Sequence, residues 1–186
     1  IGYRASAILS HVFAALGLVM LTVLPDLLPD PYIGMIAAVA VYAVGGGLLE
    51  VVISPIIEAC PTDNKERTMS LLHSFYCWGH VGVVLISTAF FALFGTENWK
   101  VMALLWAIVP AVNLVVFATA PIYSLDGGDQ PSERVGGLFR NRLFWIFMLM
   151  MVCAGASEQA VGQWASAFAE RGLGVSKAVG DLAGPM

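Results

Sequence analysis

Two glutamates stand inside long apolar stretches of this chain. Glu50 and Glu158 lie deepest, in runs that are otherwise almost free of charge. Transfer of a carboxylate from water into hydrocarbon is costly unless the group is paired, solvated or neutralised. Loss of water also favours the neutral form of a carboxyl group. We therefore interpret both residues as functional candidates that carry a proton or form hydrogen bonds with a hydroxylated ligand.

A stretch with two histidines supplies a candidate polar helix face. His73, Tyr76, Cys77 and His80 follow the spacing i, i+3, i+4 and i+7, which places them on one side of a helix. Such a face is expected to border a bundle interior or a water-filled cavity rather than lipid. Alternatively, the imidazoles satisfy one another or a carbonyl. A metal site at His73, Cys77 and His80 has little support, because no further ligand occurs at suitable spacing.

The last long apolar stretch carries a second set of polar groups. Gln159 and Gln163 are four residues apart, with Glu158 and Trp164 beside them. The amides offer hydrogen bonds to a ligand, and the indole offers a flat apolar surface. The amides could equally bond between helices, and the tryptophan could be a packing or interfacial residue.

Three glycines before Glu50 have two possible uses. Gly45, Gly46 and Gly47 allow close approach of a neighbouring helix, or they leave room beside the glutamate for a ligand or water. Glu50 could itself have a purely structural role, in which it pairs with a neighbouring helix or with His73. These interpretations stay open at the level of the sequence.

The composition indicates a membrane protein. The 186 residues are 59% hydrophobic and 12% charged, and their mean hydropathy is +0.81, whereas soluble domains carry about 25% charged residues. A helix crosses a bilayer with about 20 mainly apolar residues. A further such stretch begins near Val175, and five are complete: residues 5–24, 33–57, 69–94, 100–120 and 143–167. The sequence thus predicts an all-α membrane protein, a polytopic bundle of transmembrane helices.

Residues 122–142 are polar and rich in Gly and Ser, the composition of a flexible linker. We expect this linker to separate two helical halves, residues 1–121 and 143–186. Basic residues collect on the cytoplasmic side of membrane proteins. Lys100, Arg171 and Lys177 fall on one side, and twice as many fall on the other: Arg4, Lys65, Arg67, Arg134, Arg140 and Arg142. The first residue, the 58–68 loop and the linker are therefore predicted to be cytoplasmic, in a cell (inner) membrane.

Several classes of function are disfavoured. Cys60, Cys77 and Cys153 are dispersed, which argues against a disulfide or zinc framework. The net charge is −4 and no basic patch with interleaved aromatics occurs, so nucleic acid is not an expected partner. No nucleophile, base and orienting group stand at workable spacing, so neither an enzyme nor a cofactor is expected. The opening "IGYRAS" predicts a piece of a longer protein.

The opening also carries a resemblance. "IGYR" is similar to the end of the loop between helices 2 and 3 in the major facilitator superfamily, usually written D-R-x-G-x-R. In that register the five spans are helices 3 to 7, a partial fold of this family, and residues 122–142 are the central loop between its two six-helix halves.

Two motifs resemble the fucose permease-like sugar:proton symporters within that superfamily. "GGGLLEVVISPI" looks like their helix 4, with Ser54-Pro55 where Asn-Pro is typical. "LLHSFYCWGHVG" looks like their helix 5, with His73 in place of a Gln. Helix 7 is similar to their G-x-E pattern, but Glu158 follows Gly155 one residue later. The G-P-x-x-G-G element of drug:proton antiporters is absent from helix 5.

The resemblance implies proton-coupled sugar uptake by alternating access, with the role of a coupling and binding glutamate carried to Glu50. His73, Gln159 and Gln163 are then candidates for sugar hydroxyls, and Tyr76, Trp78 and Trp164 for the apolar faces of the ring. The partners are a small solute, a proton, the lipid bilayer and the remaining helices of the full-length chain. Efflux of amphiphiles is the alternative, followed by a receptor or scaffold that transports nothing.

Overall fold

A computed structural model describes residues 2–123 and 135–183, which are helical and contain no strand. Three short helices are η1 (Thr96–Asn98), α5 (Val135–Leu138) and α7 (Lys177–Ala183). The long helices are α1 (Tyr3–Leu27), α2 (Pro31–Ala59), α3 (Lys65–Phe94), α4 (Trp99–Thr119) and α6 (Arg142–Leu173). The described residues form two compact units, one of residues 2–77 and 89–123 and the other of residues 78–88 and 135–183.

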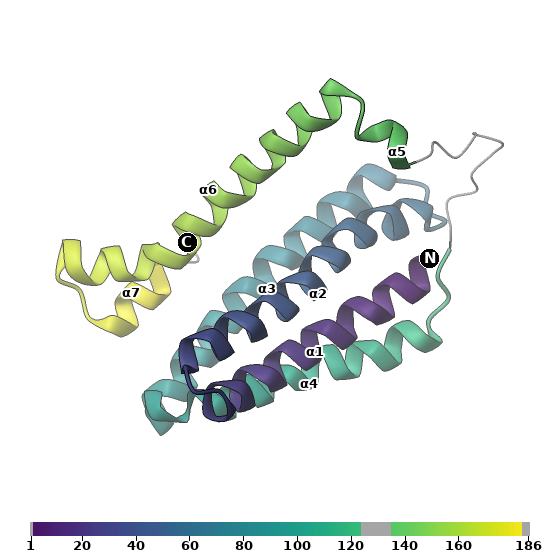
Figure 1. Cartoon of the computed structure of the whole chain (residues 1–186). Coiled ribbons are helices and arrows are strands. Elements are labelled where there is room, and N and C mark those ends of the chain that lie inside the picture. The colour runs from purple at the N-terminus through teal and green to yellow at the C-terminus, as the bar shows by residue number, and fades with distance from the viewer. Residues whose placement is uncertain (1, 124–134, 184–186) are drawn as a thin grey trace. The chain divides into compact units, whose positions relative to one another are not determined.

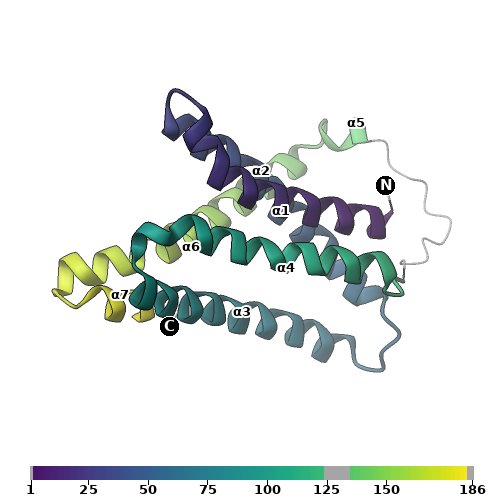
Figure 2. The ribbon, with the colours of Figure 1, turned by 90° about the horizontal axis from the view of Figure 1, so that it is seen from below.

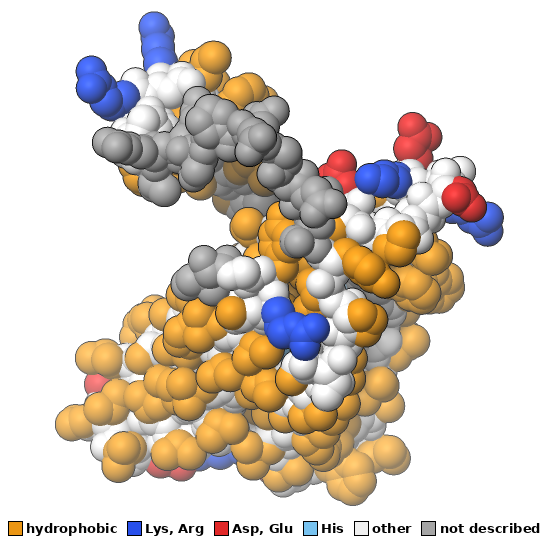
Figure 3. All heavy atoms as spheres, turned by 90° about the vertical axis from the view of Figure 1, so that its right-hand side faces the viewer, with side chains coloured by type: hydrophobic (Ala, Val, Ile, Leu, Met, Phe, Trp, Pro, Cys, Tyr) orange, Lys and Arg blue, Asp and Glu red, His pale blue; other side chains and the backbone are white. Residues whose placement is uncertain are grey.

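Five helices are long and apolar enough to cross a membrane, and they overlap the five predicted spans. The predicted all-α class is confirmed for the part of the chain that the structure describes. Each helix extends beyond the predicted span at one or both ends; α6, for example, continues to Leu173. Apolar side chains cover most of the face seen in Figure 3. That surface is what hydrocarbon solvates well and water does not.

The helix ends follow local sequence signals. The carboxylate of Asp30 accepts a hydrogen bond from the backbone N–H of Tyr32, 2.9 Å away, at the start of α2. The amide oxygen of Asn64 does the same for Arg67 at the start of α3. Both side chains satisfy a backbone donor that has no partner within the helix. The acidic and polar turns between the spans thus set where the helices begin.

In the first unit, α1 runs between α2 and α4 and contacts both (Figures 1 and 2). Glycines permit the close approach of α2. A Cβ atom at Gly17 would lie 2.7 Å from the Cα of Tyr42, and one at Gly45 would lie 2.7 Å from the carbonyl oxygen of Ser10. Small residues at helix contacts are typical of membrane bundles, where packing rather than water exclusion drives association.

Polar contacts join α1 and α4 at both ends. The guanidinium of Arg4 donates hydrogen bonds to the carbonyl oxygens of Ala118 (2.5 Å) and Ala120 (2.7 Å). At the opposite end, Nζ of Lys100 lies 2.5 Å from Oδ2 of Asp26. Because the start of one helix meets the end of the other in each case, α1 and α4 are antiparallel.

In the second unit, α6 ends at Leu173 and is followed by Gly174, whose φ of 67° is the left-handed conformation that glycine adopts without strain. The chain then turns into α7, which packs back against α6. The hydroxyl of Ser166 donates to the carboxylate of Asp181 at 2.5 Å. Lys177 lies 3.7 Å from the carboxylate of Glu170. These contacts fix the helical turn that follows the last candidate membrane helix.

The predicted linker is only partly described. Residues 124–134 lie outside the described residues, and so does Arg134 of the charge count. The remainder includes the short helix α5 and Asn141, whose amide oxygen caps the start of α6. The predicted division into halves differs from the two compact units in one stretch, residues 78–88. That division stays a prediction.

Candidate functional site

Glu50 lies on the side of α2 that faces away from α1. Gly45 and Val52 belong to the buried side of α2. Five residues separate Gly45 from Glu50, which places the glutamate about 140° around the helix from it. The side chain is exposed, and no hydrogen bond or ion pair joins it to the described residues. The side chain of Glu50 is therefore available for contact with a ligand, with water or with a helix outside this unit.

The three glycines before Glu50 turn out to differ. Only Gly45 sits where a Cβ atom would collide, against the backbone of Ser10 and Ala14. Gly46 and Gly47 have no atom within 4 Å of such a position. Gly45 therefore serves close helix approach, whereas the other two leave open space on the side toward Glu50.

The predicted face of α3 is exposed along its length. His73, Tyr76, Cys77 and His80 are all accessible, and α3 has no buried residue. His73 and Tyr76 belong to the first compact unit and His80 to the second. In the described part of the chain, no group of three His, Cys, Asp or Glu side chains could hold a metal ion.

The predicted residues of α6 are exposed in the second unit. Glu158, Gln159, Gln163 and Trp164 are accessible, and the indole of Trp164 remains 67% exposed. Ala169, near the end of the helix, is its buried residue. The structure places these four side chains along one stretch of α6. That they meet Glu50 and the face of α3 around one solute stays a prediction.

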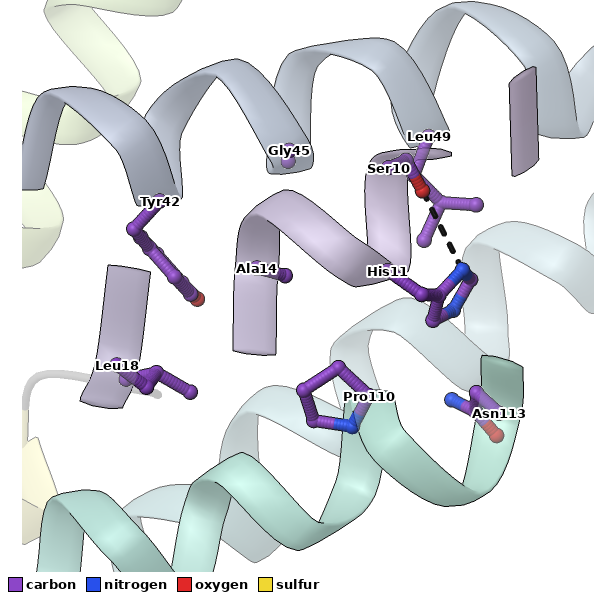
Figure 4. A pocket seen from close by; sticks show the side chains of 10 residues that line it. Ser10, His11, Ala14, Leu18, Tyr42, Gly45, Leu49, Pro110 and Asn113 are labelled. Carbon is purple, nitrogen blue, oxygen red and sulfur yellow. Dashed lines mark hydrogen bonds between the residues drawn. The ribbon is translucent and has the colours of Figure 1, made fainter. Parts of the chain in front are cut away.

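A pocket of about 200 Å³ lies in the first unit, lined by α1, α2 and α4. Tyr42 and Leu18 lie at one end of the pocket, and His11 and Asn113 at the other (Figure 4). No charged side chain lines it. The complete lining is Ser10, His11, Ala14, Leu18, Tyr42, Gly45, Gly46, Leu49, Pro110 and Asn113.

His11 is the most constrained polar group of the pocket. Its side chain is buried, with 3% of the residue exposed. Nδ1 lies 2.7 Å from the carbonyl oxygen of Ala7 and 3.3 Å from Oγ of Ser10. The ring also packs against Phe117 of α4, with 5.0 Å between centroids. These contacts hold the imidazole in one orientation at the α1–α4 contact.

Sequence reasoning did not find this pocket. His11 and Asn113 each stand alone in an apolar span, without a second polar residue at helical spacing. The available signal was the presence of an imidazole or amide inside a membrane span, which marks a functional candidate by itself. Their proximity depends on the packing of α1 against α4, which no local pattern encodes.

Comparisons with protein-family models, curated proteins and solved structures gave no match to this chain. The functional argument therefore rests on the residues and their placement.

Proposed function

We propose that this chain is part of a secondary active transporter of the major facilitator superfamily, which moves a small hydroxylated solute, a sugar, together with a proton. The proposal rests on one observation. Polar and ionisable side chains occupy exposed faces of three helices that are long and apolar enough to cross a membrane, α2, α3 and α6.

Such faces are poorly compatible with lipid. Glu50, His73, His80 and Glu158 each need a hydrogen-bonding or charged partner, or water, at the depth of the membrane. No hydrogen bond or ion pair to another described residue meets this need at these four side chains. Further helices of the full-length protein would cover the faces and enclose water between them. Transporters of this kind place their substrate near the membrane midplane, between helical repeats.

Within that cavity each group has a role suited to its chemistry. Glu50 takes up and releases the proton, because an acidic group at the depth of the membrane must be paired, solvated or neutralised. Pro55 has no N–H to donate to the carbonyl of Val51, so α2 offers a second acceptor close to the glutamate. His80 and Glu158 extend the set of groups that exchange protons along the path.

The amide and aromatic groups suit a sugar. His73, Gln159 and Gln163 provide donors and acceptors for hydroxyl groups, and Tyr76 and Trp164 provide flat surfaces for the apolar faces of a ring. Neutralisation of Glu50 together with solute binding would lower the cost of moving the loaded site during alternating access. The excess of basic residues supports a cytoplasmic position for the start of α1, the 58–68 loop and the linker.

Efflux of amphiphiles is the second candidate, and a specific feature of α6 favours it. The half of the helix before Gly155 exposes methionine and aromatic side chains, which adapt to ligands of varied shape. They are Trp145, Phe147, Met148, Met150 and Met151.

Uptake by the full-length protein in proteoliposomes tests the proposal. Labelled sugars are supplied under an inward proton gradient, and wild type is compared with Glu50→Gln. Glu58→Gln, a change of the same kind near the end of the same helix, is the control. We expect Glu50→Gln to lose gradient-driven uptake and to retain exchange of sugar across the membrane, with Glu58→Gln unaffected.

Two other results would contradict it. Equal gradient-driven uptake in wild type and Glu50→Gln would reduce Glu50 to a structural contact. No sugar uptake in the wild type, together with proton-driven export of an amphiphilic dye, would replace symport with efflux.

A further inference from the structure

The pocket around His11 is separate from the face proposed for the transported solute. It lies among α1, α2 and α4, whereas Glu50 does not line it. Its polar groups are few, and Ala14 and Pro110 form apolar walls between its two ends (Figure 4), where Leu18 and Leu49 add further apolar lining. A monosaccharide carries hydroxyl groups on all sides, and several would stay unpaired here, at a cost for each. The pocket therefore suits a different molecule.

The hydrogen bonds of His11 determine which ring nitrogen is available. A carbonyl oxygen only accepts, so Nδ1 must carry the hydrogen that it shares with Ala7. The hydroxyl of Ser10 donates to the same carbonyl, 3.0 Å away. In the neutral imidazole Nε2 is then an acceptor with a free lone pair.

Nε2 is the ring nitrogen of His11 that is left without a partner in the described part of the chain. It has no hydrogen bond to any described residue. Among the described residues, no fully buried side-chain nitrogen or oxygen lacks a hydrogen-bond partner. Nε2 therefore keeps some accessible surface, and His11 is one of the residues that line the pocket. A ligand that fills this space must offer a hydrogen-bond donor.

Asn113 adds a second requirement. Its amide lines the same end of the pocket and has no partner among the described residues. The amide both donates and accepts, so the oxygen of a hydroxyl group can bond to it while the hydrogen of that group points to His11. No charged side chain is present to balance an ion, so the ligand is neutral.

Size sets the last condition. A cavity of about 150 Å³ holds benzene, and the volume here is about 200 Å³. We propose that this pocket is a binding site for a small neutral ring compound that bears a hydroxyl group, which donates to Nε2 of His11. Phenol is the simplest probe of that class, and toluene has the same shape without the donor.

Nitrogen NMR of the full-length protein in lipid nanodiscs tests the proposal, with histidines labelled with ¹⁵N. The signals of His11 are assigned by their absence in His11→Gln. Phenol should shift the Nε2 resonance of His11 and leave those of His73 and His80 in place. Toluene should leave the Nε2 resonance of His11 unchanged. The comparison of phenol with toluene is made on the wild type alone.

Two glycines of α2 provide a matched pair. Gly46 lines the pocket and Gly47 does not, and both have open space where a side chain would begin. Gly46→Leu should abolish the shift caused by phenol, and Gly47→Leu should retain it. The proposal is overturned if phenol leaves Nε2 unchanged, which would show that water alone occupies the pocket. It is also overturned if Gly46→Leu responds like the wild type.

Discussion

At the scale of single residues, Gly45 and Gly47 stand two positions apart in α2, and a methyl group should have opposite effects at the two. At Gly45 it would collide with the backbone of Ser10 and Ala14, and overpacking of this kind costs about 1–3 kcal/mol. At Gly47 it meets nothing, and alanine favours a helix over glycine by about 0.5–1 kcal/mol. Unfolding by denaturing detergent in mixed micelles measures both.

We expect Gly45→Ala to unfold at lower detergent content than wild type, and Gly47→Ala at equal or higher content. Equal loss of stability in both variants would contradict the close approach of α1 and α2 at Gly45.

The three histidines show which residues helical spacing can identify and which it cannot. His73 and His80 were identified because polar neighbours recur at helical spacing, and the structure places both on the exposed surface of α3. His11 has no such neighbours in sequence and was missed, although it is the histidine with defined contacts. Its environment comes from α4, far away along the chain, through Phe117 and Asn113.

At the scale of helices, two unlike contacts hold α1 against α4. Arg4 bonds two carbonyl oxygens at the end of α4, where the negative end of the helix dipole favours a cation. Lys100 and Asp26 form an ion pair whose side chains are 38% and 69% exposed. Exposed pairs contribute about 0–1 kcal/mol. Arg4 is exposed too, but it makes two charged hydrogen bonds at once, so it should be the stronger contact.

We therefore expect Arg4→Gln to lower the free energy of unfolding by about 1–2 kcal/mol, because charged hydrogen bonds to the carbonyls are lost. Arg140→Gln removes a similar charge from an exposed side chain without such bonds and should change stability little. Unfolding in mixed micelles measures both variants. Equal effects would show that net charge rather than the contact with α4 matters.

The ion pair should behave differently from Arg4. Asp26→Asn should cost less than about 1 kcal/mol, and the difference should vanish at high salt, because salt screens exposed charges. The same unfolding measurement at low and high ionic strength checks this. An effect that persists at high salt would show that the pair is shielded from water.

At the scale of the whole molecule, the sequence predicted the helical class and the five candidate membrane helices, because span length and apolar composition are local properties. It placed helix ends less well, because an apolar span marks the membrane segment, whereas the helix continues through polar residues to caps such as Asn64 and turns such as Gly174. The contact of α1 with α4 was not predictable, because residues that touch, such as His11 and Phe117, are far apart in sequence. The proposed family stays a prediction from motifs.

The central claim at this scale is that the polar face of α3 borders water inside the membrane. Cys77 is on that face, whereas Phe75 lies about 160° away around the same helix at nearly the same depth. Both are exposed in the structure, so only the surroundings in the full-length protein distinguish them. A thiol reacts as its thiolate, which forms in water and not in hydrocarbon.

The measurement is the rate at which a charged, membrane-impermeant thiol reagent labels each position in the full-length protein in native membranes. One variant keeps Cys77 as the single cysteine, and the other carries Phe75→Cys with Cys77→Ser. We predict labelling at Cys77 faster by at least about tenfold, as expected for a thiol in water against one in an apolar environment. Equal rates, or no labelling at Cys77, would contradict a water-filled path along α3.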